Sequence, residues 1–337
     1  MKKLIVFFVL AFGAYMVHAQ ADVMDAHYQA MTEAQSGNMD KAISIIKNAE
    51  ANNPNSLVLL KDDVLLNTTN KQYNSAIAAG KQLIALPDAD DQSYQALGAA
   101  YAGAGQNTEA VKVYREGIQR FPASGVLYAE YGDVLSNMGN TSEAAKIWEL
   151  GIQADPTISG NYYSLSKYYA AHQNPLWSVL YGEIFINIET FSTRTHEIKD
   201  AVFQQYRALF AADNVLQNYM DNGQPFEKAV AATLFQFKDM VSEGVTPESL
   251  DALRGQFLVN WFSGDNAKNF PYKLFDRQLQ LSKIGIFSAY NQWLFSSYNQ
   301  NLFTSWAQLH NGEINEFSKF QRSSIFNVPK GQYYQHN

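Results

Sequence analysis

A spacing of 34 residues organises the first half of this chain and restricts its fold more than any other feature. Residues of the same or a similar kind recur at this spacing in six pairs: Gly98 and Gly132, Gly105 and Gly139, Ala110 and Ala144, Tyr114 and Trp148, Gly117 and Gly151, and Pro122 and Pro156. A fixed period of this size is typical of chains built from stacked supersecondary units. Small residues let two helices approach closely, and proline ends a helix because it cannot continue one. The period therefore predicts a series of helical hairpins.

The residues at these positions resemble the tetratricopeptide repeat, a pair of antiparallel helices with small residues at their crossing and a proline after the second helix. One unit carries Leu97, Gly98, Tyr101, Ala110, Tyr114 and Pro122, and the next carries Tyr131, Gly132, Leu135, Ala144, Trp148 and Pro156. The resemblance implies that the hairpins stack into a superhelix, with a groove lined mainly by the first helix of each pair. It also implies that the groove binds a peptide or a partner protein.

The period divides this part of the chain into units at residues 23–56, 57–90, 91–124 and 125–158, followed by a degenerate fifth unit at 159–192. In the fifth unit, Gln173 stands where glycine is expected and Ser178 stands where alanine is expected. We therefore expect a repeat domain over residues 20–192 with four to five hairpins. The expected fold class is all-α, a tetratricopeptide-type superhelix followed by a smaller all-helical domain.

Candidate partner-binding residues lie at the groove positions that the resemblance indicates on the first helices. They are Gln95, Ala99, Glu130, Asp133, Tyr163 and Lys167. One variant of the family clamps a terminal carboxylate with lysine and asparagine at such positions, and this chain does not carry that set. The groove is expected to be mildly acidic and mixed polar. The alternative is that these residues form ordinary solvated helix faces.

The second half of the chain differs from the first in composition. Residues 20–160 contain 9 aromatic side chains, whereas residues 161–337 contain 33. The change predicts a boundary near Ser192, a helical domain over residues 193–326 and an irregular tail over residues 327–337. Aromatic residues at helical spacing are usually core residues.

The stretch from Ile284 to Gly312 contains no Lys, Arg, Asp or Glu. The aromatic residues that we select from it as a candidate surface are Tyr290, Trp293, Tyr298 and Trp306. An uncharged surface rich in Trp, Tyr and amides suits the centre of a protein interface, and it would also suit stacking on sugar rings. The alternative is that the stretch forms two buried helices.

The first 19 residues have the features of a secretory signal peptide. Lys2 and Lys3 precede an apolar run that ends at Val17, and Ala19 is a small residue at the cleavage position. The run is shorter than the roughly 20 residues that a membrane-spanning helix needs. The chain contains no cysteine that could carry a lipid anchor. We therefore expect a bacterial protein that is periplasmic or secreted after cleavage near Ala19, is not a lipoprotein and has no membrane span.

Patterns typical of catalytic or metal sites are missing from the sequence. The net charge of −7 argues against nucleic-acid binding, which needs a basic surface, and no two histidines share a helix face. Asp88, Asp90 and Asp91 are expected to cap the following helix, because the glycine and the final glutamate of a calcium loop are absent. We therefore expect no catalytic residues, no cofactor and no metal.

These observations predict an exported, non-catalytic protein that binds or scaffolds a protein or peptide partner. Binding would use the repeat groove, the aromatic surface or both. One alternative is a glycan-binding accessory protein of the cell envelope, suggested by the uncharged aromatic stretch. Another is an enzyme whose site forms only in three dimensions, which requires a pocket where at least two titratable groups converge.

Overall fold

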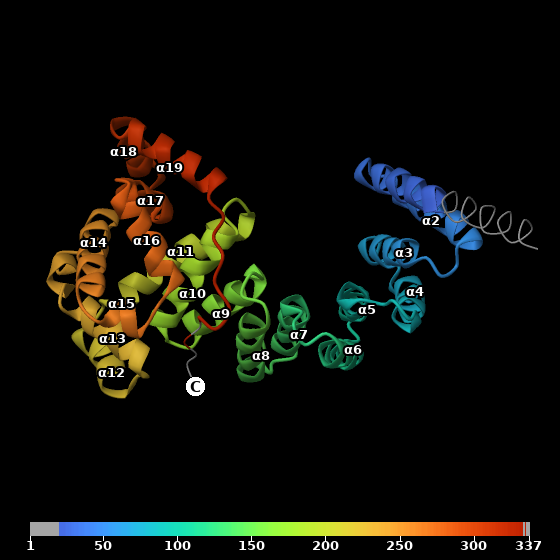
Figure 1. Cartoon of the computed structure of the whole chain (residues 1–337), viewed down its shortest axis with the longest axis horizontal. Helices are drawn as coiled ribbons and strands as arrows, with labels where there is room; N and C mark the ends of the chain where they lie inside the picture. Colours follow the sequence, from blue (N-terminus) through green and yellow to red (C-terminus); the bar gives the residue numbers. More distant parts are fainter. Residues whose placement is uncertain (1–19, 333, 335–337) are drawn as a thin grey trace, which may run out of the picture. The chain divides into compact units, whose positions relative to one another are not determined.

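The computed structural model describes residues 20–332 and residue 334. The predicted signal peptide at residues 1–19, with its cleavage position near Ala19, lies outside these residues. All regular structure in the described part of the chain is helical, which confirms the predicted all-α fold class (Figure 1). Contacts divide the chain into two compact units, one ending at Ala144 and the other beginning at Ala145. We call them the N-terminal unit and the C-terminal unit.

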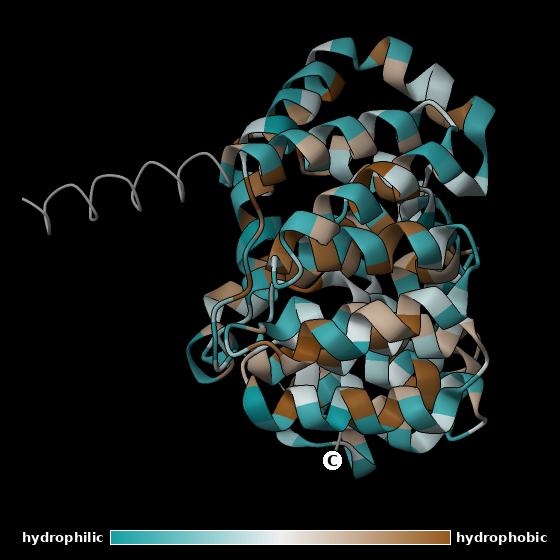
Figure 2. Cartoon of the chain, turned by 90° about the vertical axis from the view of Figure 1, so that its right-hand side faces the viewer, coloured by the Kyte–Doolittle hydropathy of each residue, from teal (hydrophilic) through white to brown (hydrophobic). Residues whose placement is uncertain are grey.

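The N-terminal unit is a run of helices that follows the predicted period. It contains a helix over residues 20–35, α2 (Met39–Asn52), α3 (Leu57–Thr69), α4 (Tyr73–Ala85), α5 (Asp91–Gly103), α6 (Asn107–Arg120), α7 (Gly125–Asn137) and the first residues of α8 (Thr141–Ala154). From α2 to α6, each helix packs against its successor, and α5 also contacts α3 and α7. Figure 2 shows hydrophobic and hydrophilic residues alternating along individual helices, as expected for helices that bury one face.

The turn inside each predicted hairpin contains a residue in the left-handed backbone conformation. These residues follow the 34-residue period, and their φ values are: Gly37 84°, Lys71 59°, Gly105 72°, Gly139 84° and Gln173 55°. The residue after each one donates its backbone N–H to the carbonyl five residues earlier, as Gln106 does to Tyr101 over 2.9 Å. This pattern is a Schellman turn, which ends a helix and usually contains glycine. The fifth turn therefore keeps the repeat geometry although Gln173 replaces the expected glycine.

The small residues of the repeat lie where its helices pack most closely. A Cβ added to Gly98 would come within 2.3 Å of the Tyr114 ring, and one added to Gly117 would come within 2.8 Å of Tyr94. Ala110 is fully buried. A larger side chain at either glycine would push the helices apart, so the predicted role of these small residues is confirmed.

The C-terminal unit is a cluster of helices in which α10 is the most deeply buried. Besides the rest of α8, it contains α9 (Ser159–Ala171), α10 (Pro175–Ile188), α11 (Thr193–Leu209), α12 (Asp213–Asn222), α13 (Pro225–Phe235), η1 (Lys238–Val241), α14 (Pro247–Ser263), α15 (Asn266–Asn269), α16 (Lys273–Lys283), α17 (Phe287–Leu294), η2 (Ser296–Tyr298), α18 (Gln300–Leu309) and α19 (Asn311–Ser323). Every residue from Pro175 to Ile186 is buried, because α10 packs against both α9 and α11. The predicted domain boundary near residue 192 therefore falls inside this unit.

After α19 the chain has no helix or strand in its described residues. Residues 324–332 and 334 form this segment, which we call the strap. Phe326 and Val328 of the strap are buried. The segment is therefore irregular in secondary structure but packed against the C-terminal unit.

Candidate functional site

The candidate groove residues lie on the first helices of successive hairpins. Their helices are α5 for Gln95 and Ala99, α7 for Glu130 and Asp133, and α9 for Tyr163 and Lys167. The first four belong to the N-terminal unit and the last two to the C-terminal unit. The structure brings Gln95 and Glu130 together, since Gln95 Nε2 donates to Glu130 Oε1 over 3.3 Å.

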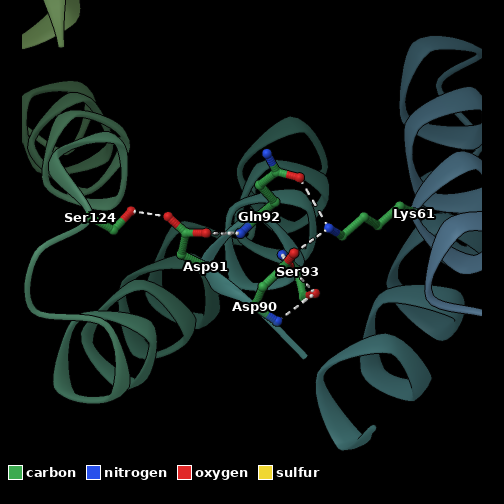
Figure 3. Close-up of polar contacts among 6 residues, drawn as sticks. All are labelled: Lys61, Asp90, Asp91, Gln92, Ser93 and Ser124. Carbon is green, nitrogen blue, oxygen red and sulfur yellow. Dashed lines mark hydrogen bonds and ion pairs between the residues drawn. The ribbon is translucent and has the colours of Figure 1, made fainter. Parts of the chain in front are cut away.

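Polar contacts link each first helix of the N-terminal unit to the next. Nδ1 of His27 lies 2.7 Å from Oδ2 of Asp62 on α3. Lys61 Nζ on α3 donates to Asp90 Oδ2 over 2.5 Å and to Gln92 Oε1 over 3.0 Å (Figure 3). The hydrogen bond from Gln95 to Glu130 joins α5 to α7 in the same way. We call the residues of this series of contacts the polar ladder: His27, Lys61, Asp62, Asp90, Gln92, Gln95 and Glu130. The ladder connects the first helices of successive hairpins, and two of its members, Gln95 and Glu130, are predicted groove residues.

Asp90 joins the polar ladder to the beginning of α5. Its carboxylate accepts hydrogen bonds from Ser93 N over 3.0 Å and from Ser93 Oγ over 2.7 Å, which confirms the predicted capping role. The adjacent Asp91 accepts a bond from Ser124 Oγ over 2.6 Å (Figure 3). Burial by itself would raise the pKa of Asp90, but the hydrogen bonds from Lys61 and Ser93 outweigh it and hold the pKa below its usual value.

Two other carboxylates of the ladder are partly withdrawn from water. Burial raises the pKa of Asp62, and the hydrogen bond with His27 only partly opposes this. Burial also raises the pKa of Glu130; the Gln95 bond opposes it, and the nearby charge of Asp133 adds to it. Over residues 20–144 the chain carries 15 acidic and 8 basic side chains. Partly desolvated carboxylates in an acidic unit are stabilised by an approaching cation.

An apolar row accompanies the polar ladder at the same 34-residue period. It consists of Met31, Leu65 and Ala99, which follow the ladder residues His27, Lys61 and Gln95 by four residues and therefore lie on the same side of their helices. Leu65 is 54% exposed, and the other two are half-buried. We call the ladder and this row together the first-helix face. Its polar groups bond to one another beside an exposed leucine.

Tyr163 and Lys167 form a separate cluster with Glu197 of α11. The Tyr163 hydroxyl donates to Glu197 Oε2 over 2.6 Å, and Lys167 Nζ lies 2.7 Å from Glu197 Oε1. The guanidinium of Arg194 lies 4.9 Å from the Tyr163 ring centroid. The hydrogen bond from Lys167, followed by that from Tyr163, lowers the pKa of Glu197. These two candidate residues therefore tie α9 to α11 at the surface.

The predicted aromatic surface is wrong for Tyr290. This residue of α17 is 1% exposed, and its hydroxyl donates to Glu183 Oε1 over 2.7 Å. It is buried because α17 packs against α14, α16 and α19. Trp293, also on α17, is half-buried, with Lys199 Nζ 4.4 Å from its ring centroid.

The other half of the aromatic stretch is exposed. Tyr298 at the end of η2 is 46% exposed, and α18 contains no buried residue. Trp306 on α18 is half-buried and stacks on the ring of His310, with centroids 4.2 Å apart. The alternative prediction of two buried helices therefore holds for α17 and fails for α18.

A buried ion pair inside the C-terminal unit has no recognisable pattern in the sequence. Glu183 of α10 and Arg254 of α14 are both buried, and Arg254 Nη2 donates to Glu183 Oε1. Gln278 Nε2 and the Tyr290 hydroxyl donate to the same oxygen, each over 2.7 Å. The four residues come from four different helices, so no local sequence pattern could have revealed them.

A cavity of about 20 Å³ lies beside this pair, with Glu183, Arg254 and Gln278 in an otherwise mostly apolar wall. A space of this size holds about one water molecule. Two charged groups therefore converge here, as the enzyme alternative requires, but without room for an organic substrate. Within residues 20–332 and 334, no group of three His, Asp or Glu side chains is placed to hold a metal ion. No helix of the described part is both long and apolar enough to cross a bilayer.

Comparison with protein-family models agrees with the predicted repeat. A family model of the tetratricopeptide repeat matches residues 91–124. MamA, whose crystal structure is known, has 21% sequence identity to this chain and a TM-score of 0.40. The alignment covers 48% of this chain and 94% of MamA. The structure of PilF from Pseudomonas aeruginosa has 13% sequence identity to this chain and a TM-score of 0.48. The alignment covers 63% of this chain and 96% of PilF. The C-terminal part of a repeat-containing protein from Cytophaga hutchinsonii has 14% sequence identity to this chain and a TM-score of 0.44. That alignment covers 72% of this chain and 98% of the other.

No curated protein matches the chain at a significant level. The family match coincides with the unit that contains α5 and α6, where Gly98, Ala110 and Tyr114 pack as the motif requires. The same turn recurs at the 34-residue period in five hairpins. Repeats of this type suggest a role in protein–protein interaction or scaffolding. Residues 91–124 therefore form a tetratricopeptide repeat within a longer series of helical hairpins.

Proposed function

We propose that this protein is an exported, non-catalytic scaffold whose first-helix face binds a basic segment of a partner protein. One observation carries the proposal: Leu65, 54% exposed, stands in an apolar row beside the acidic polar ladder. Leu65 and the half-buried side chains of Met31 and Ala99 give an arriving segment apolar contact area. The ladder holds the surrounding polar groups in place before a partner arrives, which reduces the ordering cost of binding.

The charge of the N-terminal unit favours a basic partner. Its 15 acidic side chains exceed its 8 basic ones. Complementary charge speeds association and discriminates against acidic partners. The expected partner segment therefore presents apolar side chains to Met31 and Leu65 and carries Lys or Arg nearby.

A photo-crosslinking amino acid at position 65 tests this proposal in the exporting cell. We expect it to capture one partner protein through a segment that contains Lys or Arg. The same amino acid at position 259 is the control, because Val259 is 65% exposed on α14 of the C-terminal unit. Equal capture from both positions, or a captured segment without basic residues, contradicts the proposal.

Binding measurements with the captured partner make the test quantitative. Leu65→Glu is expected to weaken binding by about tenfold, which corresponds to about 1.4 kcal/mol, whereas Val259→Glu leaves the affinity unchanged. Added salt should weaken the association, because it screens the attraction between the acidic unit and the basic segment. An affinity that is independent of both Leu65 and salt would remove the first-helix face from consideration.

Export is part of the proposal, and it rests on the signal-like residues 1–19. The mature protein is expected in the periplasm or outside the cell, beginning at Gln20. Mass spectrometry of the protein from fractionated cells tests both expectations. A chain that retains residues 1–19 and remains with the cytoplasmic fraction contradicts them.

Glycan binding is a second candidate, favoured by the exposure of η2 and α18. Tyr298 and Leu302 are 46% and 53% exposed within a stretch that has no charged side chain. Aromatic side chains with one polar end suit a surface that is partly apolar and partly wet. Calorimetric titration against a panel of polysaccharides, with Tyr298→Ala as the matched variant, decides the matter. The candidate is removed if no polysaccharide gives heat.

A further inference from the structure

Arg254 of α14 carries a buried donor for which the described part of the chain supplies no acceptor. Its Nη2 donates to Glu183 Oε1 on α10, but its Nη1 is buried and has no hydrogen-bond partner among the described residues. The Arg254 side chain is almost completely enclosed, so bulk water does not solvate this group. A buried, charged donor is strongly unfavourable when nothing accepts from it. The position beside Nη1 therefore calls for an acceptor from outside the chain.

Glu183 has the complementary excess, which is a buried acceptor. Arg254 donates to its Oε1, and Gln278 Nε2 and the Tyr290 hydroxyl each donate to the same oxygen over 2.7 Å. No hydrogen bond within the described part of the chain uses Oε2. Both oxygens of an ionised carboxylate accept hydrogen bonds. Glu183 therefore offers an unused acceptor in the same buried cluster as the unused donor.

Tyr206 of α11 brings a hydroxyl group to this cluster. The Cζ atom of Arg254 lies 5.7 Å from the centroid of the Tyr206 ring. Burial raises the pKa of Tyr206; the charge of Arg254 opposes this shift, and the charge of Glu183 adds to it. The hydroxyl therefore lies close to both charges and stays protonated at neutral pH. A protonated phenol can both donate and accept a hydrogen bond.

The three residues line the cavity of about 20 Å³, whose remaining wall is mostly apolar. A space of this size holds about one water molecule. The opposite charges of Glu183 and Arg254 favour a neutral occupant, since an ion of either sign would be repelled by one of them. The occupant must also accept from Arg254 Nη1 and donate to Glu183 Oε2. Water satisfies the size, the charge and both hydrogen-bonding roles.

We propose that this cavity is a binding site for one water molecule, which accepts from Arg254 Nη1 and donates to Glu183 Oε2 and to the Tyr206 hydroxyl. Three hydrogen bonds are typical of a buried water that belongs to the fold. The water joins α10, α11 and α14, and it completes the hydrogen bonding of an ion pair that burial would otherwise leave unsatisfied. The proposal does not depend on the first-helix face.

A crystal structure of the full wild-type chain, at a resolution that shows buried waters, tests the site directly. We expect one peak of electron density about 2.7–3.2 Å from Arg254 Nη1 and within hydrogen-bond distance of Glu183 Oε2. A cavity without density, in a map that shows other buried waters, overturns the proposal. Crystals grown with bromide as the sole halide identify the occupant further. An anomalous peak in the cavity would show an anion and overturn the assignment to water.

A substitution in the apolar wall tests the site in solution. Val230 lines the cavity, and Val230→Ile adds a methyl group that displaces the water. Val202→Ile is the matched control, because Val202 is fully buried on α11 outside the cavity wall. This control reports the cost of adding a methyl group to a packed core. We expect the midpoint of urea unfolding to fall further for Val230→Ile than for Val202→Ile, because the lost water leaves Arg254 Nη1 without an acceptor.

An equal or smaller fall for Val230→Ile overturns the proposal, and so does a rise, which is the result of filling a dry cavity. If Val230→Ile does not fold, Val179→Ile replaces it, because Val179 is the other valine of the cavity wall. The same comparison with Val202→Ile then decides the outcome.

Discussion

Lys71 and Gln173 lie three repeat periods apart and have nearly the same left-handed backbone conformation, with φ values of 59° and 55°. Glycine occupies the equivalent position in the other three turns of the series. A side chain with a Cβ costs roughly 1–2 kcal/mol in this conformation. The packing of the hairpins therefore imposes the turn even where the sequence lacks the residue that favours it.

Replacing either residue by glycine is expected to stabilise the protein. For Lys71→Gly and Gln173→Gly we expect the free energy of unfolding to rise by about 0.5–1 kcal/mol each, because relief of the Cβ clash exceeds the extra entropy that glycine gives the unfolded chain. Urea unfolding followed by circular dichroism measures the change. Lys71→Ala is the control, since it removes the same charge and keeps the Cβ. An equal gain from alanine and glycine would assign the effect to the charge and contradict the backbone explanation.

The Asp90–Lys61 contact should make a small, pH-dependent contribution to stability. Asp90→Asn removes the charge but keeps a side chain that caps a helix well. We expect a loss of about 0.5 kcal/mol at neutral pH, because both side chains are partly exposed. The folded pKa of Asp90 is lowered, so the stabilisation is complete above the unfolded pKa of about 4 and disappears as the pH falls through the folded value.

Urea unfolding of the wild type and Asp90→Asn from neutral pH down to about pH 3 measures this contribution. The difference between the two proteins should shrink as the pH falls. Asp88→Asn is the control, because Asp88 is an exposed neighbour in the same turn region. A difference that stays constant across the range, or an equal effect from Asp88→Asn, would show that the ion pair is not its source.

Removing one partner of the buried Glu183–Arg254 pair should lower the free energy of unfolding strongly, whereas replacing both partners together should lower it little. Arg254→Met is expected to lower the free energy of unfolding by about 3–5 kcal/mol, because it leaves Glu183 buried without its cation. The double variant Glu183→Gln, Arg254→Met should recover most of this loss, since an amide oxygen remains for Gln278 and Tyr290. A double-mutant cycle measured by urea unfolding provides the test. Additive losses from the two substitutions would contradict a directly coupled pair.

The repeat could be predicted because its signal is local and recurs. Gly98 and Ala110 mark the close approach of helices within one hairpin, and the same marks return at each period. The bond between Gln95 and Glu130 could not be predicted, because the groove positions fix which helix face the residues share but not whether their side chains meet. The sequence therefore predicted which helix face these residues share, but not the hydrogen bonds of the polar ladder on that face.

Burial in the aromatic stretch depended on contacts that the local sequence does not encode. Tyr290 and Trp306 lie in similar uncharged, aromatic surroundings in the sequence. Only Tyr290 is buried, because α17 packs against α14 and α16 as well as α19, whereas α18 contacts its chain neighbours α17, η2 and α19 and buries none of its residues. Glu183 and Arg254 were missed for the same reason, since they are 71 residues apart and meet only after α10 and α14 pack.

Lys199 of α11 occupies an environment that disfavours its charge. The side chain is buried, its Nζ donates to Ser296 Oγ over 2.9 Å, and it lies 4.4 Å from the centroid of the Trp293 ring. Burial lowers the pKa of Lys199 to about 8, although the nearby charge of Asp200 opposes this. A lysine in the unfolded chain titrates near 10.5. Between these two values the unfolded chain therefore holds more protons than the folded one, so the stability of the wild type rises with pH.

Lys199→Met should consequently stabilise the protein at neutral pH, by up to roughly 3 kcal/mol, because it removes a buried charge and keeps a flexible apolar side chain. The advantage should shrink toward about pH 10, where the folded wild type has already lost the proton. Urea unfolding of both proteins at the two pH values measures the change. Lys228→Met, at an exposed lysine of α13, is the control and should track the wild type throughout. A gap between Lys199→Met and the wild type that does not narrow with pH means that the buried amine stays charged, and the prediction is then wrong.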